Sequence, residues 1–274
     1  MSTRRRLDAE LVRRGLARSR HHAVELVESG RVLVGGSLAE RPSRLVDAGE
    51  AVLVEGPPPR FVGRGGEKLD AALDRFAIDV VGLSALDAGA STGGFTDCLL
   101  QRGAVKVVAV DVGRGQLDDR LRRDRRVESH ERTNIRHAHL DDLGGQPFPV
   151  VVADLSFISL RTVIPALLDL SADDASMVAL IKPQFEAGRQ EAARGRGVIR
   201  DPAVWRRVVL DVGSAMETQG ATMMGAMVSP LKGADGNVEF LAWLRARPAG
   251  AAAPLAQRID VDALIAVAAD RGGR

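Results

Sequence analysis

Apolar runs and glycine-rich turns alternate along the chain from about residue 64 onward. Four short apolar segments have the pattern of strands: "LSALDAGAS", "VKVVAVDVG", "FPVVVADLSF" and "SMVALIKPQF". The segment "GGFTDCLLQRGA", between the first two, has the pattern of a helix. Strands that alternate with helices form a mostly parallel sheet with helices on both faces. The pattern therefore predicts an α/β domain whose ligands bind beyond the carboxyl ends of the strands.

The first 56 residues follow a different pattern, that of two short helices and a small sheet. The apolar positions expected to face inward on the two helices are Leu7, Leu11, Val12, Ala23, Leu26 and Val27. Gly15 can end the first helix, Ser19 is a suitable N-cap for the second, and Gly30 can end it. The segments "RVLVGGSL" and "EAVLVEG" predict strands, the former containing a Gly-Gly turn. These elements predict a small α+β module.

A proline-rich segment separates the two patterns. The sequence "EGPPPR" holds three prolines in six residues, which stiffen the chain into an extended spacer. We therefore expect a small module at residues 1–59, a linker at 60–64 and a larger domain at 65–274.

Composition narrows the class of protein. The chain has 274 residues, of which 45% are hydrophobic and 27% charged, as is usual for soluble globular proteins. Cys98 is the only cysteine, which excludes an intrachain disulfide framework and a cysteine-built metal site. The first residues, "MSTRRRLDAELVRRG", do not resemble a signal peptide, and no apolar run approaches 18 residues. A cytoplasmic protein without a membrane span, and without a metal, is expected.

Positive charge gathers at the beginning of the chain. The net charge is only +2, so the whole molecule is not a general polyanion binder. The arginines among the first 20 residues are Arg4, Arg5, Arg6, Arg13, Arg14, Arg18 and Arg20, against the acids Asp8 and Glu10. Such a basic face suits a phosphate-bearing partner. A solvated helix face explains the cluster equally well.

Acidic residues stand at three predicted strand ends, namely Asp87, Asp111 and Asp154. Asp87 precedes the glycine-rich turn "AGASTGG", where backbone can approach a ligand closely. Asp111 follows at the end of the next strand, the usual position for a carboxylate that binds ribose hydroxyls. Dinucleotides and S-adenosylmethionine both carry such a ribose. The turn lacks the G-x-G-x-x-G pattern, which makes a dinucleotide the weaker alternative.

Lysine is rare in this chain, which has 34 arginines and only four lysines. Lys182, in "IKPQFE", stands at the end of a predicted buried strand. Lysine is a compact charge whose pKa moves when it is buried, whereas arginine stays charged. The choice of lysine points to a site that needs an ammonium group, although chance explains this one residue taken alone.

Two resemblances follow from these motifs. The segment "LVRRGLARSRHHAVELVESGRVLVGG" resembles the small RNA-binding module named after ribosomal small-subunit protein four. The segments "LDAGASTGGFT", "VAVDVG", "VVADLSFISL", "LIKPQFE" and "GNVEFLAWLR" together resemble the FtsJ-type ribose 2′-O-methyltransferases. Through about residue 247 the chain is similar to TlyA-type ribosomal RNA methyltransferases, historically called hemolysins. The resemblance implies a Rossmann-like methyltransferase domain behind the small module.

The FtsJ resemblance also implies site residues. A catalytic tetrad falls on Lys68, Asp154, Lys182 and Glu239. Residues implied around S-adenosylmethionine are Asp87, Gly89, Ser91, Thr92, Gly93, Gly94, Asp111, Thr133, Asn134 and Asp154. The basic face of the small module, with its resemblance to the RNA-binding module, gives Arg4, Arg6, Arg13, Arg14, Arg18 and Arg20 as the expected RNA-binding residues. Phe157 is expected in the core rather than near the cofactor. Lys182 would contact the ribose hydroxyl, either as a base or as an ammonium that lowers the hydroxyl's pKa.

The resemblance implies methylation of ribosomal RNA cytidines in the large subunit, and in the small one through the longer basic extension, by a protein expected to be a monomer. A non-catalytic RNA-binding assembly factor is an alternative, which the intact tetrad disfavours. A pore-forming hemolysin is disfavoured by the lack of a membrane-spanning segment, and an NAD-dependent oxidoreductase is the other enzyme considered. The arginine-rich segments 118–126 and 188–200 either hold RNA phosphates or are solvated loops. The linker has Phe61 where a tryptophan-containing version is typical of the family.

Overall fold

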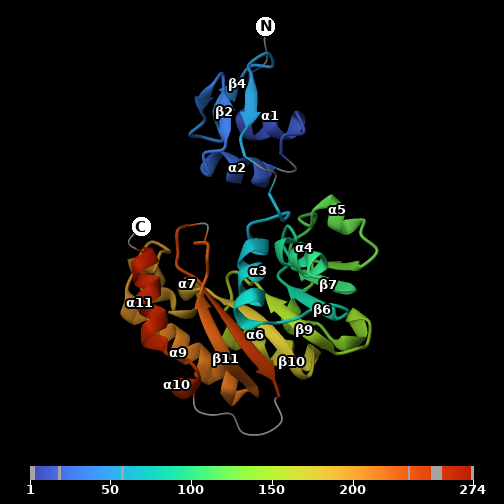
Figure 1. Ribbon diagram of the computed structural model, residues 1–274, viewed down its shortest axis with the longest axis vertical. Helices are drawn as coiled ribbons and strands as arrows, with labels where there is room; N and C mark the ends of the chain where they lie inside the picture. Colours follow the sequence, from blue (N-terminus) through green and yellow to red (C-terminus); the bar gives the residue numbers. More distant parts are fainter. Residues whose placement is uncertain (1–3, 18–19, 57–58, 234, 248–254, 273–274) are drawn as a thin grey trace. The chain divides into compact units, whose positions relative to one another are not determined.

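The chain folds into two compact units, Met1–Gly63 and Arg64–Arg274 (Figure 1). The computed structural model describes residues 4–17, 20–56, 59–233, 235–247 and 255–272. The change from one unit to the other falls within the segment 60–64, expected from the prolines before it to be a linker. Each unit has a core of its own and is described separately.

The first unit is a small α+β module. Its elements are β1 (Arg5–Arg6), α1 (Leu7–Arg13), α2 (Arg20–Glu28), β2 (Val32–Val34), β3 (Ser37–Leu38), β4 (Leu45–Val46) and β5 (Val52–Val54). Strands β1 and β4 pair with each other, and β3, β2 and β5 form an antiparallel sheet. Gly35 and Gly36 both have positive φ, 61° and 81°, which lets the chain reverse tightly between β2 and β3.

The core of this module is built from the predicted apolar positions. Leu7, Leu11, Ala23, Leu26 and Val27 are all buried in one cluster with residues of the small sheet, and Val12 packs at its edge. Gly30 has a φ of 69°, as expected for a residue that ends a helix. The predicted N-cap Ser19 lies outside the described residues.

The second unit alternates strands and helices. Its elements up to the fifth sheet strand are α3 (Gly65–Phe76), β6 (Ser84–Ala88), α4 (Gly94–Gln101), β7 (Lys106–Asp111), α5 (Asp119–Arg122), β8 (Val127–Glu131), η1 (Ile135–His137), η2 (Leu140–Leu143), β9 (Phe148–Ala153), α6 (Leu160–Leu170) and β10 (Ser171–Ile181). The remaining elements are α7 (Pro183–Glu186), α8 (Arg189–Arg194), α9 (Pro202–Thr218), β11 (Ala221–Val228), β12 (Phe240–Ala246), α10 (Leu255–Arg258) and α11 (Val261–Gly272).

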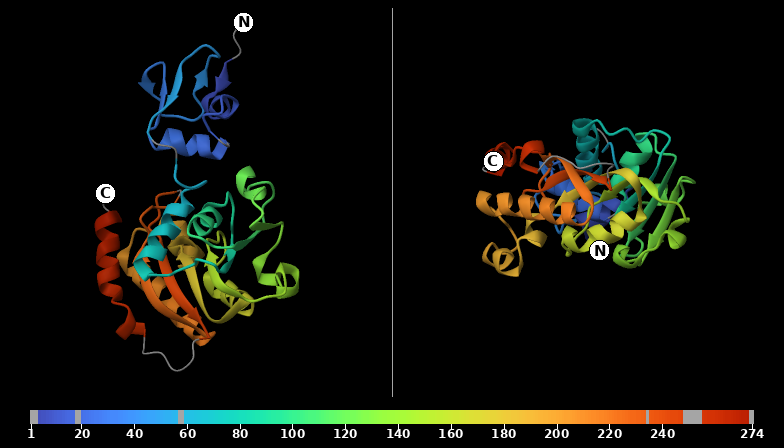
Figure 2. Two further views of the ribbon diagram at one scale, coloured as in Figure 1. Left: turned by 45° about the vertical axis from the view of Figure 1, so that its right-hand side comes forward. Right: turned by 90° about the horizontal axis from the view of Figure 1, so that it is seen from below.

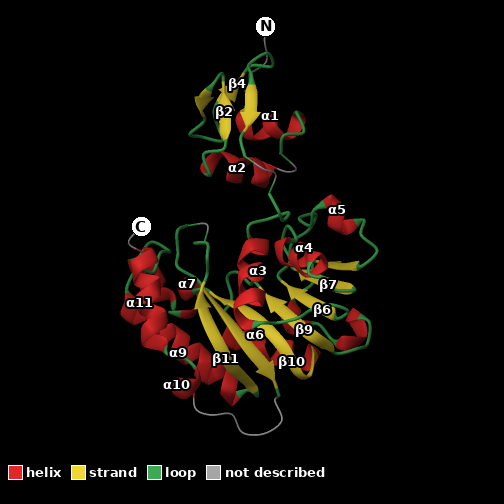
Figure 3. Cartoon of the chain, viewed as in Figure 1, coloured by secondary structure: helices red, strands yellow, loops and turns green. Residues whose placement is uncertain are grey.

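The strands of this unit form one seven-stranded sheet in the order β11-β12-β10-β9-β6-β7-β8 (Figure 3). Strands β6 to β10 pair in parallel, whereas β12 runs antiparallel to both of its neighbours. The predicted mostly parallel sheet is therefore confirmed. Because β12 is reversed, the residue before it lies at the same sheet edge as the residues that follow the parallel strands.

Helices cover both faces of the sheet (Figure 2). Leu86 and Ala88 of β6 belong to the large core cluster that also contains side chains of α6, α9 and α11. Asp87, between them, points to the opposite face, where Thr96 of α4 donates a hydrogen bond to it. This alternation is the period of two expected of a strand. Side chains of β6 therefore contact the helices on both faces of the sheet.

Strand β10 is longer than its apolar pattern predicts. It begins at Ser171, before the predicted "SMVALIKPQF", and it ends at Ile181. Pro183 lacks an amide hydrogen and cannot continue the ladder, so it begins the short helix α7 instead. Lys182 is thus the last residue before a helix, directly beyond the carboxyl end of the strand.

Candidate active site

Four charged residues meet at the edge of the sheet where the parallel strands end. Asp154 directly follows β9 and Lys182 directly follows β10, while Glu239 directly precedes the reversed strand β12. The register pairs Ile181 with Phe240, so Lys182 and Glu239 lie at neighbouring strand ends. Lys68 is added from helix α3. The sequence positions 68, 154, 182 and 239 are thereby brought to one sheet edge and the helix beside it.

These four residues form two buried ion pairs. Lys68 Nζ lies 2.5 Å from Glu239 Oε2, and Lys182 Nζ lies 2.6 Å from Asp154 Oδ1. Lys68, Lys182 and Glu239 are buried and Asp154 is partly buried. Unpaired charges would be costly at such burial, and the two positive and two negative charges cancel. The arrangement holds two ammonium groups in fixed positions without an excess of charge.

Lys182 has a second polar contact and an aromatic neighbour. Its Nζ donates a hydrogen bond to Ser156 Oγ at 3.1 Å, and it lies 5.9 Å from the centre of the Phe185 ring. An ammonium has three donors, of which one goes to Ser156, while Asp154 contacts the same nitrogen as an ion pair. Donor capacity therefore remains for a substrate oxygen. Sequence reasoning missed Ser156; its position two residues after the strand-end Asp154 was the available signal.

A cavity of about 450 Å³ opens beside this cluster, beyond the ends of β6, β7 and β9. Its lining includes six of the residues expected around the cofactor: Gly89, Ser91, Asp111, Thr133, Asn134 and Asp154. The volume is within the range of small-molecule sites. Asp154 therefore lines the cavity and pairs with Lys182, so the two features share a boundary.

Asp111 organises the loops on one side of the cavity. Its Oδ2 accepts a hydrogen bond from the Ser91 amide at 2.8 Å, and its Oδ1 accepts one from the Gly113 amide at 2.6 Å. The Ser91 hydroxyl donates to Gln116 at 3.2 Å, another cavity residue that sequence reasoning missed. Each carboxylate oxygen keeps acceptor capacity. Asp111 can therefore hold the loops and still accept a hydroxyl of a ligand.

Gly89 lets the first strand–helix turn lie close against the backbone of Asp154. It has a φ of 88°, and a Cβ built on it would lie 2.5 Å from the Asp154 carbonyl oxygen. Any side chain here would be strained and would displace the Asp154 backbone. Glycine at this position thus couples the first strand–helix turn to the strand end that carries Asp154.

Four other residues expected around the cofactor do not line this cavity: Asp87, Thr92, Gly93 and Gly94. Asp87 is fully buried and accepts a 2.6 Å hydrogen bond from Thr96, inside the sheet–helix layer. Burial raises the pKa of Asp87 to about 7, and the nearby negative charge of Asp154 adds to this, against the hydrogen bond from Thr96. Gly93 has a φ of 95° at the beginning of α4, where a Cβ would collide with Leu121. These residues shape the turn.

Phe157 corrects an expectation. It was expected in the core, but its side chain is 91% exposed and its φ is 64°. It lines the mouth of the cavity, and its ring lies 5.2 Å from the Phe185 ring. The expectation failed because hydrophobicity alone does not show that the chain turns outward after Asp154. An exposed aromatic residue in a strained backbone conformation is a feature of functional sites.

The arginines of the first unit differ in their surroundings. Among the predicted RNA-binding arginines that the structure describes, Arg4, Arg6, Arg13 and Arg20 are exposed or half-exposed. Arg14 is largely buried and donates to backbone carbonyls. Arg18 lies outside the described residues. The part of the chain that the structure describes contains no cluster of histidine, cysteine or acidic residues able to hold a metal, and no helix long and apolar enough to cross a membrane.

Comparison with known proteins identifies both units. Residues 61–246 match the FtsJ-like methyltransferase family, and residues 5–52 match the S4 domain. The chain belongs to the FtsJ-like methyltransferase family. This confirms the resemblance drawn from the glycine-rich turn, the strand-end acids and "LIKPQFE".

The similarity of this FtsJ-like methyltransferase extends over both units. It is 50% identical over 246 residues to 16S/23S rRNA (cytidine-2'-O)-methyltransferase TlyA of Mycobacterium tuberculosis, covering 89% of this chain and 91% of that protein. It is 42% identical to "Putative rRNA methyltransferase YqxC" of Bacillus subtilis, covering 88% and 85% of the two chains. The solved structure "Putative hemolysin from Streptococcus thermophilus" superposes with a TM-score of 0.77 at 36% identity, covering 98% and 97%.

Proposed function

We propose that this protein transfers a methyl group from S-adenosylmethionine to a ribose 2′-hydroxyl of ribosomal RNA. The observation that carries the proposal is the position of Asp154, which lines the cavity and lies 2.6 Å from Lys182 Nζ. A methyl donor in the cavity and a hydroxyl at Lys182 would therefore be neighbours. Holding the two reactants in line supplies much of the rate of a displacement reaction.

The cavity residues fit the proposed cofactor. Asp111 is placed to accept hydrogen bonds from ribose hydroxyls, and Gly89 and Ser91 present backbone to the amino acid moiety. Thr133 and Asn134 lie on the part of the lining where the adenine is proposed. When bound, S-adenosylmethionine supplies the electrophilic methyl group. Asp87, Thr92, Gly93 and Gly94 act through the shape of the turn, since they do not line the cavity.

Lys182 acts on the attacking hydroxyl. As a bond between the hydroxyl oxygen and the methyl carbon formed, the bond between that carbon and the cofactor's sulfonium sulfur would break, leaving S-adenosylhomocysteine, and the hydroxyl proton would pass to solvent water. A free donor of Lys182 would stabilise the negative charge that develops on the oxygen, and Asp154 and Ser156 keep the ammonium in place. The ion pair between Lys68 of helix α3 and Glu239, the residue before β12, stabilises the same sheet edge.

Phe157 offers a surface for the acceptor nucleotide. Its exposed ring stands at the mouth of the cavity and is supported by Phe185, which also neighbours Lys182. Bases that leave a helix stack on aromatic side chains of proteins that recognise RNA. Stacking of the acceptor base on Phe157 would bring its ribose towards Lys182.

The proposed substrate is a cytidine of ribosomal RNA. The Mycobacterium tuberculosis relative is named for this nucleotide in 16S and 23S rRNA, and the S4 domain provides a second, basic RNA-binding unit. We propose that this chain also modifies both ribosomal subunits, because its similarity to that relative covers nearly the whole length of both proteins. A ribosomal substrate also implies that the protein works in the cytoplasm.

The test is transfer of labelled methyl from S-adenosylmethionine to ribosomal subunits that lack the modification. Label on a cytidine 2′-oxygen with the wild type, and none with a folded Lys182→Ala variant that still binds the cofactor, supports the reaction and the residue. No transfer to either subunit or to free ribosomal RNA, despite cofactor binding, would contradict the proposed function. It would favour a non-catalytic RNA-binding role.

A further inference from the structure

Two acidic side chains are buried in the most basic part of the chain. Asp8 and Glu10, both in α1, have side chains that are only 4% and 1% exposed. A buried carboxylate is costly unless it is paired and hydrogen-bonded. Each of these two carboxylates is paired with two arginines. Each group of one acid and two arginines thus carries one net positive charge.

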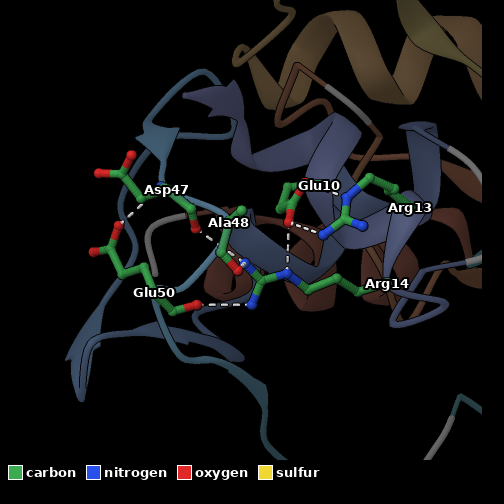
Figure 4. Close-up of polar contacts among 6 residues, drawn as sticks. All are labelled: Glu10, Arg13, Arg14, Asp47, Ala48 and Glu50. Atoms are coloured by element: carbon green, nitrogen blue, oxygen red, sulfur yellow. Dashed lines mark hydrogen bonds and ion pairs between the residues drawn. The ribbon is translucent and has the colours of Figure 1, made fainter. Parts of the chain in front are cut away.

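Glu10 holds Arg13 through both carboxylate oxygens (Figure 4). Arg13 Nε donates to Glu10 Oε2 at 2.7 Å, and Arg13 Nη2 donates to Oε1 at 2.6 Å. This side-on pair uses two of the five guanidinium donors. The Arg13 side chain is 47% exposed, and among the described residues it donates only to Glu10. Its outer edge is therefore fixed in direction and open to solvent.

Arg14, the residue after Arg13, makes a different set of hydrogen bonds. Its Nε donates to Glu10 Oε1 at 2.7 Å, and its other nitrogens donate to the carbonyl oxygens of Glu50, Asp47 and Ala48 (Figure 4). Its side chain is only 19% exposed. Arg14 thus ties Glu10 to the turn before β5, which fixes the carboxylate that in turn fixes Arg13.

Asp8 repeats this arrangement on another side of α1. Arg6 donates to it through Nε and through Nη2, the latter at 2.8 Å, and Arg20 donates through Nη2 at 3.2 Å. Arg6 and Arg20 are both at least half exposed. Asp8 therefore links an arginine before α1 to one at the beginning of α2, and neither is buried by the contact.

We propose that Asp8 and Glu10 are positioning residues that hold Arg6, Arg13 and Arg20 ready as ligands for phosphates of the RNA backbone. A free arginine loses side-chain freedom when it binds a phosphate, whereas a clamped one has already lost it. The guanidinium keeps donors for a second anion because the carboxylate occupies one edge only. This inference rests on the proposed function, since it assigns the phosphate contacts of the proposed RNA-binding unit.

The direction in which Glu10→Gln changes RNA affinity distinguishes a positioning role of Glu10 from an effect of net charge. Glu10→Gln removes a negative charge from a basic module, which by charge alone should tighten RNA binding. Positioning predicts the opposite, because a glutamine cannot accept from Arg13 at both oxygens. The matched control is Glu40→Gln, which removes the same charge from an exposed position of the same unit. Binding of the full chain to ribosomal subunits lacking the modification is measured as a function of salt.

Glu10→Gln is expected to weaken binding roughly tenfold and to reduce the salt slope by about 0.7 to 0.9, the share of one phosphate contact. Glu40→Gln should bind as tightly as the wild type or more tightly. The double variant Glu10→Gln/Arg13→Ala should bind no more weakly than Arg13→Ala alone, because the two residues act as a unit. Cofactor affinity should be unchanged in all of them.

A second substitution distinguishes the loss of positioning from a folding defect. Arg13→Lys preserves the charge and one contact to Glu10 but loses the bidentate guanidinium, and it should also weaken RNA binding. The inference is overturned if Glu10→Gln binds as tightly as Glu40→Gln, or if Arg13→Lys binds like the wild type while Arg13→Ala does not. If Arg13→Ala and Arg20→Ala leave binding and its salt slope unchanged, the proposed RNA-binding role of the module itself fails.

Discussion

Lys68 and Glu239 lie 171 positions apart in the sequence, yet their side chains form a buried 2.5 Å ion pair. Helix α3 supplies Lys68, and Glu239 directly precedes the reversed strand β12. The contact joins the first helix of the methyltransferase unit to its last sheet strand. It therefore couples the integrity of the fold to the geometry beside Lys182.

Breaking this pair should destabilise the second unit. Glu239→Gln leaves Lys68 as a buried charge without its partner, which should lower the free energy of unfolding by about 3–5 kcal/mol. Adding Lys68→Met should recover much of this loss, because the stranded charge is then removed, while methyl transfer stays impaired. Denaturant unfolding and methyl transfer measured on both variants test this. Recovery of activity together with stability would show that the pair is only structural.

Lys182 is expected to be needed for the reaction and not for the fold. Lys182→Ala should reduce kcat by roughly 10²–10³-fold, the usual contribution of one positioned donor to a developing negative charge. Lys182→Arg should also lose most activity, because the guanidinium fork is bulkier than the ammonium and cannot take the same position beside Asp154 and Ser156. Lys106→Ala is the control, since Lys106 begins β7 at the sheet edge opposite to the tetrad and forms a partly exposed pair with Glu128. Full activity of Lys182→Arg would argue against both roles considered for the lysine.

Asp111 should govern cofactor affinity. Asp111→Asn replaces an acceptor of two backbone amides by a group with one acceptor and one donor edge, so the Ser91 or Gly113 contact is lost. Affinity for S-adenosylmethionine should fall roughly tenfold or more. Calorimetric titration against the exposed control Asp119→Asn checks this. Unchanged affinity would move the ribose site away from Asp111.

Phe157 should matter for RNA and hardly for stability. Phe157→Gly removes an exposed ring from a residue whose positive φ suits glycine, so the free energy of unfolding should change by no more than about 1 kcal/mol. Loss of a stacked base should raise KM for ribosomal subunits roughly tenfold. Steady-state kinetics with each substrate varied in turn would show the effect. A loss confined to cofactor affinity would contradict the stacking role.

Asp87 should make stability depend on pH. Its pKa is raised in the folded state from 3.8 to about 7, so the folded protein binds more protons than the unfolded chain between these values. The free energy of unfolding should therefore fall as pH rises from about 4 to 7, by at most about 1.4 kcal/mol per pH unit, and Asp87 should contribute no further change above that. Asp87→Asn should flatten this part of the profile. Unfolding curves of both proteins at four or five pH values measure it.

The sequence predicted the layers of the fold because these depend on local periodicity. The tetrad positions came from the order of the family's motifs, and the structure brings these four residues together in two ion pairs. Leu7, Leu11 and Ala23 are buried as the stripe on each helix required. Phe157 was placed wrongly, since the direction of a loop after a strand end depends on tertiary contacts such as that with Phe185. The hydrogen-bond partners of Arg13 and Arg14 could not be predicted from the sequence either. Whether an arginine faces solvent or a carbonyl is settled by the turn at residues 47–50, which sequence spacing does not position.

The reversed strand has a consequence for the order in which the protein is made. Strand β12 inserts between β10 and β11, although it is synthesised after both. Until it arrives, β10 presents an open edge able to pair with another chain. Glu239 is synthesised directly before that strand. The ion pair between Lys68 and Glu239 therefore cannot form until nearly all of the sheet has been synthesised. A chain that ends before β12 therefore lacks the complete charge cluster, and the cluster is completed by the same strand that covers the edge of β10.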